Sequence, residues 1–151
     1  MLNPDFKEFI ESLNYNGVRY LVVGGYAVAF HGLPRYTKDL DIWLELSSDN
    51  AKKVISALES FGFGSLGLTE EDFLEKDQII QLGLPPARID LLTQLTGLTF
   101  DECYHSHVVI ETDGLTIPII DRQNLIINKK ATGRIQDLAD VEGLERLESE
   151  E

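Results

Sequence analysis

The 151-residue sequence has little cysteine, few basic residues and no long apolar run, and each shortage excludes a class of protein. Its single cysteine, Cys103, cannot form an internal disulfide, as expected of a protein from a reducing cytoplasm. No apolar run reaches the roughly 20 residues needed to span a bilayer. The first 14 residues combine acids with helical periodicity, unlike a signal peptide. We therefore expect a cytoplasmic protein that does not cross a membrane.

Basic residues are scarce: 13 lysines and arginines stand against 26 aspartates and glutamates, for a net charge of −13. An acidic surface repels polyanions, so we expect no non-specific nucleic-acid binding. This charge does not exclude a small nucleotide held by a metal ion and a local basic cluster. The alternative is that the acidity only keeps the protein soluble.

Length and composition indicate one domain over residues 1–151. The hydrophobic content of 43% is enough for a sizeable core in a chain of this length. The sequence has no internal repeat and no linker. Its acid-rich end, residues 145–151, is expected to fray.

Apolar periodicity and capping residues predict helices and short strands in mixed order. The expected helices run from Pro4 to Asn16-Gly17, over residues 26–30, from a cap at Ser47 or Ser48 to Gly62, from a cap at Asp121 to about Ala131, and over residues 134–147. The expected strands cover residues 18–23, 40–45, 79–82, 87–92, 108–111 and 115–119, with a hairpin turn at Asp113-Gly114 and a short helical turn capped by Thr69. This order predicts an α+β (mixed α/β) fold with a short mixed sheet flanked by helices.

Residues 20–44 carry the strongest functional pattern. An apolar strand runs into Gly24-Gly25, a short helical segment follows, and a basic turn leads to Asp39 and Asp41. Because side chains two apart on a strand share a face, these carboxylates project together and favour a cation between them. Hard oxygen ligands suit Mg²⁺, and the free N–H groups of a Gly-Gly turn before a helix suit phosphate. The pattern predicts phosphoryl or nucleotidyl transfer.

Asp90 is a third candidate carboxylate, because it lies inside the apolar run of residues 88–92. An unpaired acid there would cost several kcal/mol if it were buried. We favour a position in the same pocket as Asp39 and Asp41. The alternative is that Asp90 pairs with Arg88, two residues away on the same strand face.

Further candidates lie around these motifs. Arg35 and Lys38 flank the acidic pair and either neutralise a triphosphate or balance the carboxylates without metal. Trp43 shares the Asp41 face by alternation, where a core position is favoured over a base pocket. His105 and His107 share a face if a strand begins there. Two histidines are too few for a zinc site, so we interpret them as surface residues.

These motifs resemble the nucleotidyltransferase superfamily, which includes DNA polymerase beta and kanamycin nucleotidyltransferase. The shared pattern is G-G followed by R-x-T-x-D-x-D and a later I-D-L strand. The chain is most similar to the small minimal nucleotidyltransferases of prokaryotic toxin–antitoxin systems. They share G-G-Y-A-V-x-x-H-G, here residues 24–32, and L-I-x-N-K-x-A-x-G-R-x-x-D-x-x-D, here residues 125–140. The likeness covers about residues 15–145.

The resemblance implies a Mg²⁺- or Mn²⁺-dependent transfer of a nucleoside monophosphate from an NTP to a hydroxyl of a protein, a tRNA or a small molecule. It places Asp39, Asp41 and Asp90 at the metals as catalytic residues.

For the nucleotide, the resemblance implies that Gly24 and Gly25 bind phosphates, with Lys129 as a further contact. Much of the superfamily has Gly-Ser where this chain has Gly24-Gly25. The alternative is a catalytically inactive interaction protein, such as a toxin–antitoxin component that acts by binding.

The last expected helix is the only element left over for a substrate platform. Its apolar residues recur at three-residue steps, from Ile135 to Leu147. They either cap the core of the protein itself, which we favour, or contact a co-encoded partner or a second copy of the chain.

Overall fold

The computed structural model of the protein describes residues 2–33, 37–83 and 88–150. The helices are α1 (Pro4–Tyr15), α2 (Gly24–Phe30), α3 (Ser48–Phe61), α4 (Phe100–His105), α5 (Arg122–Thr132) and α6 (Ile135–Ser149), with two 3-10 turns, η1 (Gly64–Leu66) and η2 (Glu70–Phe73). The strands are β1 (Tyr20–Val23), β2 (Leu40–Leu44), β3 (Ile79–Leu82), β4 (Ile89–Leu92), β5 (Val108–Thr112) and β6 (Leu115–Ile119). None of the helices in these ranges is long and apolar enough to cross a membrane.

The strands form one six-stranded mixed sheet in the order β3-β4-β2-β1-β6-β5. The central strand β2 pairs antiparallel with β1 and parallel with β4, and β1 pairs parallel with β6. Two antiparallel hairpins, β3–β4 and β5–β6, form the edges. This arrangement confirms the predicted α+β fold with a short mixed sheet.

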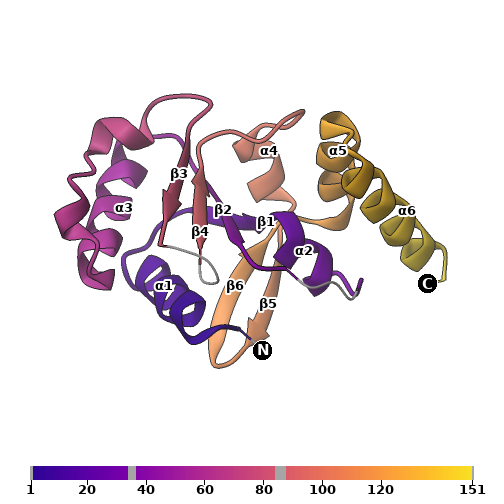
Figure 1. Ribbon diagram of the computed structural model, residues 1–151, viewed down its shortest axis with the longest axis horizontal. Helices are drawn as coiled ribbons and strands as arrows, with labels where there is room; N and C mark the ends of the chain where they lie inside the picture. Colours follow the sequence, from indigo (N-terminus) through magenta and orange to yellow (C-terminus); the bar gives the residue numbers. More distant parts are fainter. Residues whose placement is uncertain (1, 34–36, 84–87, 151) are drawn as a thin grey trace.

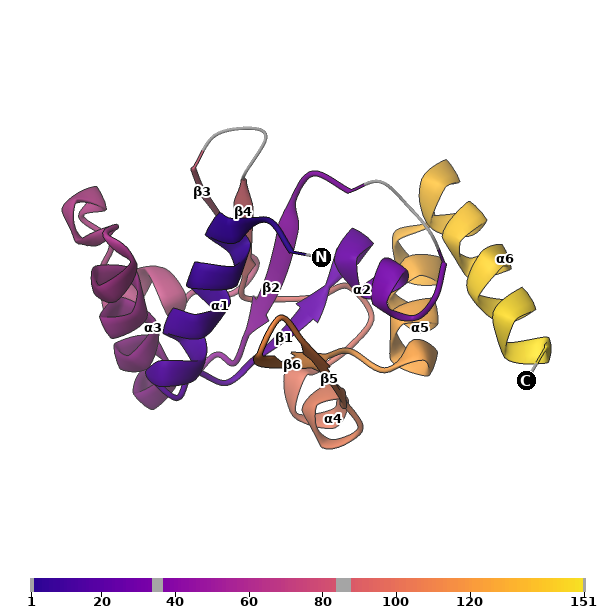
Figure 2. The same ribbon diagram turned by 90° about the horizontal axis from the view of Figure 1, so that it is seen from below.

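Two pairs of helices lie at opposite ends of the molecule. Helices α1 and α3 pack together at one end, and α5 and α6 pack together at the other, as Figures 1 and 2 show. The short helix α2 contacts both central strands, β1 and β2, and also α5. Helix α2, which follows β1 directly, therefore links the centre of the sheet to the α5–α6 pair.

The predicted caps explain why most helices begin and end where they do. The Asn3 side chain accepts a hydrogen bond at the start of α1, and Ser47 and Asp121 do the same for α3 and α5. Thr69 and Asp72 form the predicted capping box of η2. Gly62 ends α3 in the left-handed conformation that glycine adopts without strain.

The region around residue 105 differs from the sequence expectation. His105 ends helix α4, and strand β5 begins at Val108, so the two histidines do not share a strand face. His107 is half-buried, stacks on the Tyr104 ring and contacts the Tyr104 carbonyl oxygen. The sequence does not predict helix α4, because its six residues are too few for a periodic apolar pattern. Phe100 of α4 packs edge-on against Trp43, which is buried in the core as favoured.

Helix α6 divides its apolar residues between core and surface. Val141 and Leu144 are buried, whereas the side chains of Ile135 and Leu138 are 90% and 51% exposed. Residues three apart are rotated by about 300° around the helix axis, so a series of such steps does not stay on one face and some of its side chains point to solvent. The helix continues to Ser149, where Lys130–Glu145 and Glu142–Arg146 ion pairs hold its last turns.

Candidate active site

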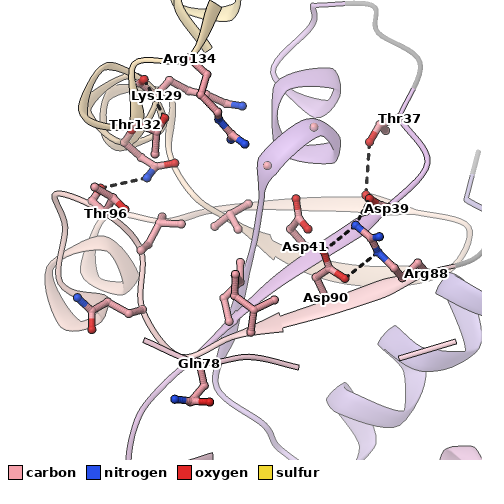
Figure 3. Close-up of a pocket in the computed structure, with 18 of the residues that line it drawn as sticks. Thr37, Asp39, Asp41, Gln78, Arg88, Asp90, Thr96, Lys129, Thr132 and Arg134 are labelled. Atoms are coloured by element: carbon pink, nitrogen blue, oxygen red, sulfur yellow. Dashed lines mark hydrogen bonds and ion pairs between the residues drawn. The ribbon is translucent and has the colours of Figure 1, made fainter. Parts of the chain in front are cut away.

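Three aspartates from two neighbouring strands meet in one pocket. Asp41 lies opposite Asp90 in the parallel β2–β4 register, and Asp39 immediately precedes β2. Paired residues on adjacent strands lie about 5 Å apart and point to the same face. All three line a pocket of about 800 Å³ together with Gly24 and Gly25. Figure 3 shows the carboxylates at one wall, and Lys129 and Thr132 of α5 with Arg134, which precedes α6, at the opposite wall.

Arg88 joins two of these carboxylates. Its Nη2 donates to Asp39 Oδ2 at 2.6 Å and to Asp90 Oδ2 at 3.3 Å, and its Nε donates to Asp90 Oδ1 at 3.1 Å. Asp90 therefore occupies the pocket and also pairs with Arg88, so both alternatives considered for it are realised in one geometry. The sequence did not indicate the second half of this bridge, to Asp39.

Asp41 lies close both to Asp90 of β4 and to Gly24 at the start of α2. Burial, reinforced by the negative charges of Asp90 and Asp39, raises the pKa of Asp41 to about 7, although Lys129 and Arg88 act in the opposite direction. Burial also raises the pKa of Asp90, against the effect of Arg88. Ionised carboxylates this close repel each other, and a divalent cation relieves that repulsion.

The Gly24-Gly25 pair is required by its neighbours. A Cβ on Gly24 would lie 2.0 Å from Asp41 Oδ2, and the φ of Gly24 is +67°, so glycine is needed for both space and backbone. A Cβ on Gly25 would lie 2.6 Å from Thr37 Oγ1. The two glycines open α2, whose first-turn N–H groups have no acceptor within the helix.

The opposite wall is a cluster of paired charges. Lys129 is buried, and its Nζ lies 3.2 Å from carboxylate oxygens of both Asp137 and Asp140. Arg134 also donates to Asp137, yet its side chain is 78% exposed. Lys130 points away and pairs with Glu145. Of the two lysines, the structure thus places Lys129 in the pocket lining, together with Arg134.

Two basic residues of the sequence motif remain, Lys38 and Arg35. Lys38 is exposed and lines the pocket. Arg35 lies outside the described residues. The lining also contains Gln78, Gln94 and Asn128, which the sequence did not single out, because an isolated amide side chain has no distinctive spacing.

The donor set fits a hard divalent cation that arrives with a nucleotide. Within the described ranges, no group of three acidic, histidine or cysteine side chains is arranged to hold a metal ion. Arg88 instead engages Asp39 and both oxygens of Asp90. Mg²⁺ in phosphate-binding sites needs only one or two carboxylates and takes its other ligands from phosphate and water.

The sheet, the flanking helices and the pocket define a protein with the nucleotidyltransferase fold. The Thermotoga maritima protein TM1012, described as a candidate nucleotidyltransferase, superposes with a TM-score of 0.58 at 15% identity, over 100% of this chain and 97% of that chain. The lincomycin-bound lincosamide antibiotic adenylyltransferase LnuA superposes with a TM-score of 0.57 at 14% identity, over 96% of this chain and 97% of that chain. An antigenic nucleotidyltransferase-like protein from Paracoccidioides brasiliensis superposes with a TM-score of 0.56 at 10% identity, over 95% of this chain and 75% of that chain.

At these identities the structural likeness shows the fold alone. No protein-family model matches the sequence, and no curated protein matches it. The similarity to toxin–antitoxin proteins therefore stays a prediction.

Proposed function

We propose that the protein is a metal-dependent nucleotidyltransferase that moves a nucleoside monophosphate from an NTP to a hydroxyl acceptor. The observation that carries this proposal is the convergence of Asp39, Asp41 and Asp90 in one pocket with the glycine-rich start of α2. Carboxylates suit the metal ions, and free backbone N–H groups suit phosphate oxygens. The fold supports the same reaction class.

In this proposal the nucleotide phosphates lie between the two walls of the pocket. Gly24 and Gly25 contact the β- and γ-phosphates through backbone N–H groups. Lys38 and Lys129 contribute positive charge, as does Arg35 of the sequence motif. The two ion pairs of Lys129 make it a fixed charge in the wall, so we add Arg134, whose side chain is 78% exposed although its Nε pairs with Asp137 at 2.8 Å.

Asp39, Asp41 and Asp90 would hold Mg²⁺ or Mn²⁺. When bound, these ions neutralise the phosphates and keep the attacking and leaving oxygens in line. The acceptor oxygen forms a bond to the α-phosphorus, the bond from that phosphorus to the oxygen of the β-phosphate breaks, and pyrophosphate leaves. Asp90 takes the proton of the acceptor hydroxyl.

The acceptor is a hydroxyl of a protein, a tRNA or a small molecule, and the structure favours none of these. LnuA, by its name, adenylylates a lincosamide antibiotic, so a small-molecule acceptor is one case to test. A second chain, either a co-encoded partner or another copy, would supply the surface that orients the acceptor for attack.

One observation favours a second candidate function, that of a non-catalytic binding protein. Arg88 already pairs with two of the three carboxylates, and Gly25 offers no hydroxyl to a phosphate. A protein with this pocket could bind a nucleotide or a partner chain without transfer.

Thermal unfolding with Mg²⁺ or Mn²⁺ and each NTP in turn tests the first function. A ligand that binds only the folded state at 100 times its Kd stabilises it by about 2.7 kcal/mol. We expect a rise in Tm that Asp41→Asn abolishes, and pyrophosphate release when the acceptor is present. The control is Asp49→Asn, which removes a carboxylate that is 82% exposed on α3.

The possible outcomes separate the two functions. A nucleotide-dependent rise in Tm without pyrophosphate release for any acceptor would favour the binding protein. If no NTP raised the Tm, nucleotide binding would be excluded from both candidate functions. If Asp41→Asn unfolded the protein, Asp41 would be a structural residue, whereas relief of repulsion at a carboxylate with a raised pKa predicts equal or greater stability.

A further inference from the structure

The Arg88 guanidinium occupies the position in which a bound metal ion would contact Asp39 and Asp90. Its guanidinium donates three hydrogen bonds to Asp39 and Asp90 at 2.6 to 3.3 Å. A divalent ion would bind through the lone pairs of these same oxygens, at about 2 Å. The guanidinium and the ion therefore compete for the same lone pairs.

The bridge is not needed to hold the two strands together. β2 and β4 already pair over four consecutive residue positions, from Leu40–Ile89 to Trp43–Leu92. Arg88 and its two partners are each about one-third exposed or less, and Arg88 itself is 31% exposed. A partly exposed ion pair adds little to stability, so the bridge is better explained by its effect on the pocket.

Charge indicates what that effect is. With all three aspartates ionised, Arg88 reduces the local charge from −3 to −2, and it leaves Asp41 as the carboxylate whose oxygens it does not engage. A divalent ion entering alone meets the positive guanidinium a few ångströms away. A triphosphate changes this balance, because guanidinium groups bind phosphate oxygens in the same bidentate way as carboxylates.

We propose that Arg88 is the internal counter-cation of this acidic pocket. It holds Asp39 and Asp90 in the nucleotide-free protein, opposes a divalent cation that arrives alone, and moves to the phosphates when a metal–nucleotide complex enters. Only the movement of Arg88 to the phosphates rests on the proposed function. The competition between Arg88 and a cation does not depend on that function. The consequence is that metal binding depends on nucleotide.

Mn²⁺ binding measured by electron paramagnetic resonance of the free ion, without nucleotide, tests the competition. Wild type should bind Mn²⁺ weakly, and Arg88→Gln should bind it at least about tenfold more tightly, because a like charge has been removed beside the ion. Arg88→Lys keeps the charge but not the fork, so its affinity should lie between the two. A non-hydrolysable NTP should raise the affinity of wild type much more than that of Arg88→Gln.

A matched control is Arg19→Gln, which breaks another arginine–carboxylate pair, with Glu45 at 3.0 Å, away from this pocket. It should leave Mn²⁺ binding unchanged. Equal Mn²⁺ affinity in folded Arg88→Gln and wild type would overturn the role of Arg88, and so would tight binding of Mn²⁺ alone by wild type, a result that needs no variant to fold. If nucleotide changed Mn²⁺ affinity in no variant while Arg88→Gln still bound Mn²⁺ more tightly, the proposed function would fail and the competition would stand.

Discussion

Gly25 and Thr37 are packed so closely that the side chain of one excludes a side chain at the other. A Cβ on Gly25 would lie 2.6 Å from Thr37 Oγ1 and 3.0 Å from Thr37 Cβ, closer than non-bonded atoms approach. Thr37 in turn sits two residues before Asp39, and its hydroxyl faces the Asp39 carbonyl oxygen at 3.4 Å. The absence of serine at position 25 thus has a local steric cause.

This packing makes a prediction about paired substitutions. Gly25→Ser should destabilise the protein by about 1–3 kcal/mol, the usual cost of overpacking a filled site. Thr37→Ala should recover much of that loss in the double variant, since it removes the Oγ1 contact. Denaturant unfolding of the four proteins in a double-mutant cycle measures the coupling.

Gly64→Ser is the control, because a Cβ there meets its nearest neighbour, Glu59 Cγ, at an ordinary 3.5 Å. Additive effects of the Gly25 and Thr37 substitutions would contradict the steric explanation.

The site residues that could be predicted are those fixed by strand alternation. Asp39 and Asp41 share a face because they are two apart, and Asp90 was placed with them because an apolar strand rarely carries a lone acid. The Arg88–Asp39 bridge could not be predicted, because it depends on β4 pairing beside β2 in one register. No local pattern contains that pairing.

Asn50 shows the same limit away from the pocket. Its buried amide donates to the carbonyl oxygens of Arg19 and Glu45 and accepts from the Arg19 N–H, so it ties α3 to the ends of β1 and β2. In the sequence it is one polar residue in the first turn of a helix, where exposure is the usual outcome.

At the scale of elements, a buried ion-pair cluster joins α5 to α6. Asp137 of α6 accepts from Lys129 and Thr132 of α5 and from both the backbone and side chain of Arg134. Burial alone would raise the pKa of Asp137, but these hydrogen bonds outweigh it and hold the pKa well below its usual range. The contribution of Asp137 to the stability of the fold therefore depends on its being ionised.

Asp137→Asn should cost about 2–4 kcal/mol at pH 7, slightly less than the loss of a whole buried pair because Lys129 keeps Asp140. The sign of the pH dependence follows from the depressed pKa. The contribution of Asp137 is complete above the pKa of about 3.9 that an aspartate has in the unfolded chain, and it is lost as the pH falls below that value. The stability gap between wild type and variant should therefore narrow in acid.

Urea unfolding at pH 7 and at lower pH values measures this gap. Glu145→Gln is a suitable control, since its pair with Lys130 is half exposed and should contribute less than about 1 kcal/mol. A gap of constant size down to about pH 3 would show that Asp137 acts through packing or hydrogen bonding alone.

Most elements could be predicted because their ends carry chemical signals. Side-chain caps, a capping box and left-handed glycines mark the ends of α1, α3, α5 and η2, and Asp113-Gly114 marks the β5–β6 turn. Helix α4 has no side-chain cap bond and only six residues, so the sequence pattern does not predict it. The split of α6 into buried and exposed apolar residues also depends on where α5 packs, which periodicity alone does not contain.

At the scale of the whole molecule, negative charge dominates, and the pocket is where positive groups gather. Of 13 basic residues, four of those described line this one pocket: Lys38, Arg88, Lys129 and Arg134. Two of them, Arg88 and Lys129, are each paired with two carboxylates. In the proposed function the pocket therefore binds a few phosphates together with a metal, while the rest of an acidic surface repels a polyanion.

Bulk DNA and RNA should accordingly bind weakly, and binding should be lost at about 150 mM salt, where the Debye length is about 8 Å. Few phosphate contacts also give a shallow dependence of affinity on salt. Fluorescence polarisation with a duplex and with single-stranded RNA at low and physiological salt measures both, beside a basic DNA-binding domain as positive control. Tight, sequence-independent duplex binding at about 150 mM salt would contradict this interpretation. An RNA end bound in the pocket is a separate case, because it needs few phosphates, and a metal–NTP complex should displace it while leaving any binding elsewhere on the surface unchanged.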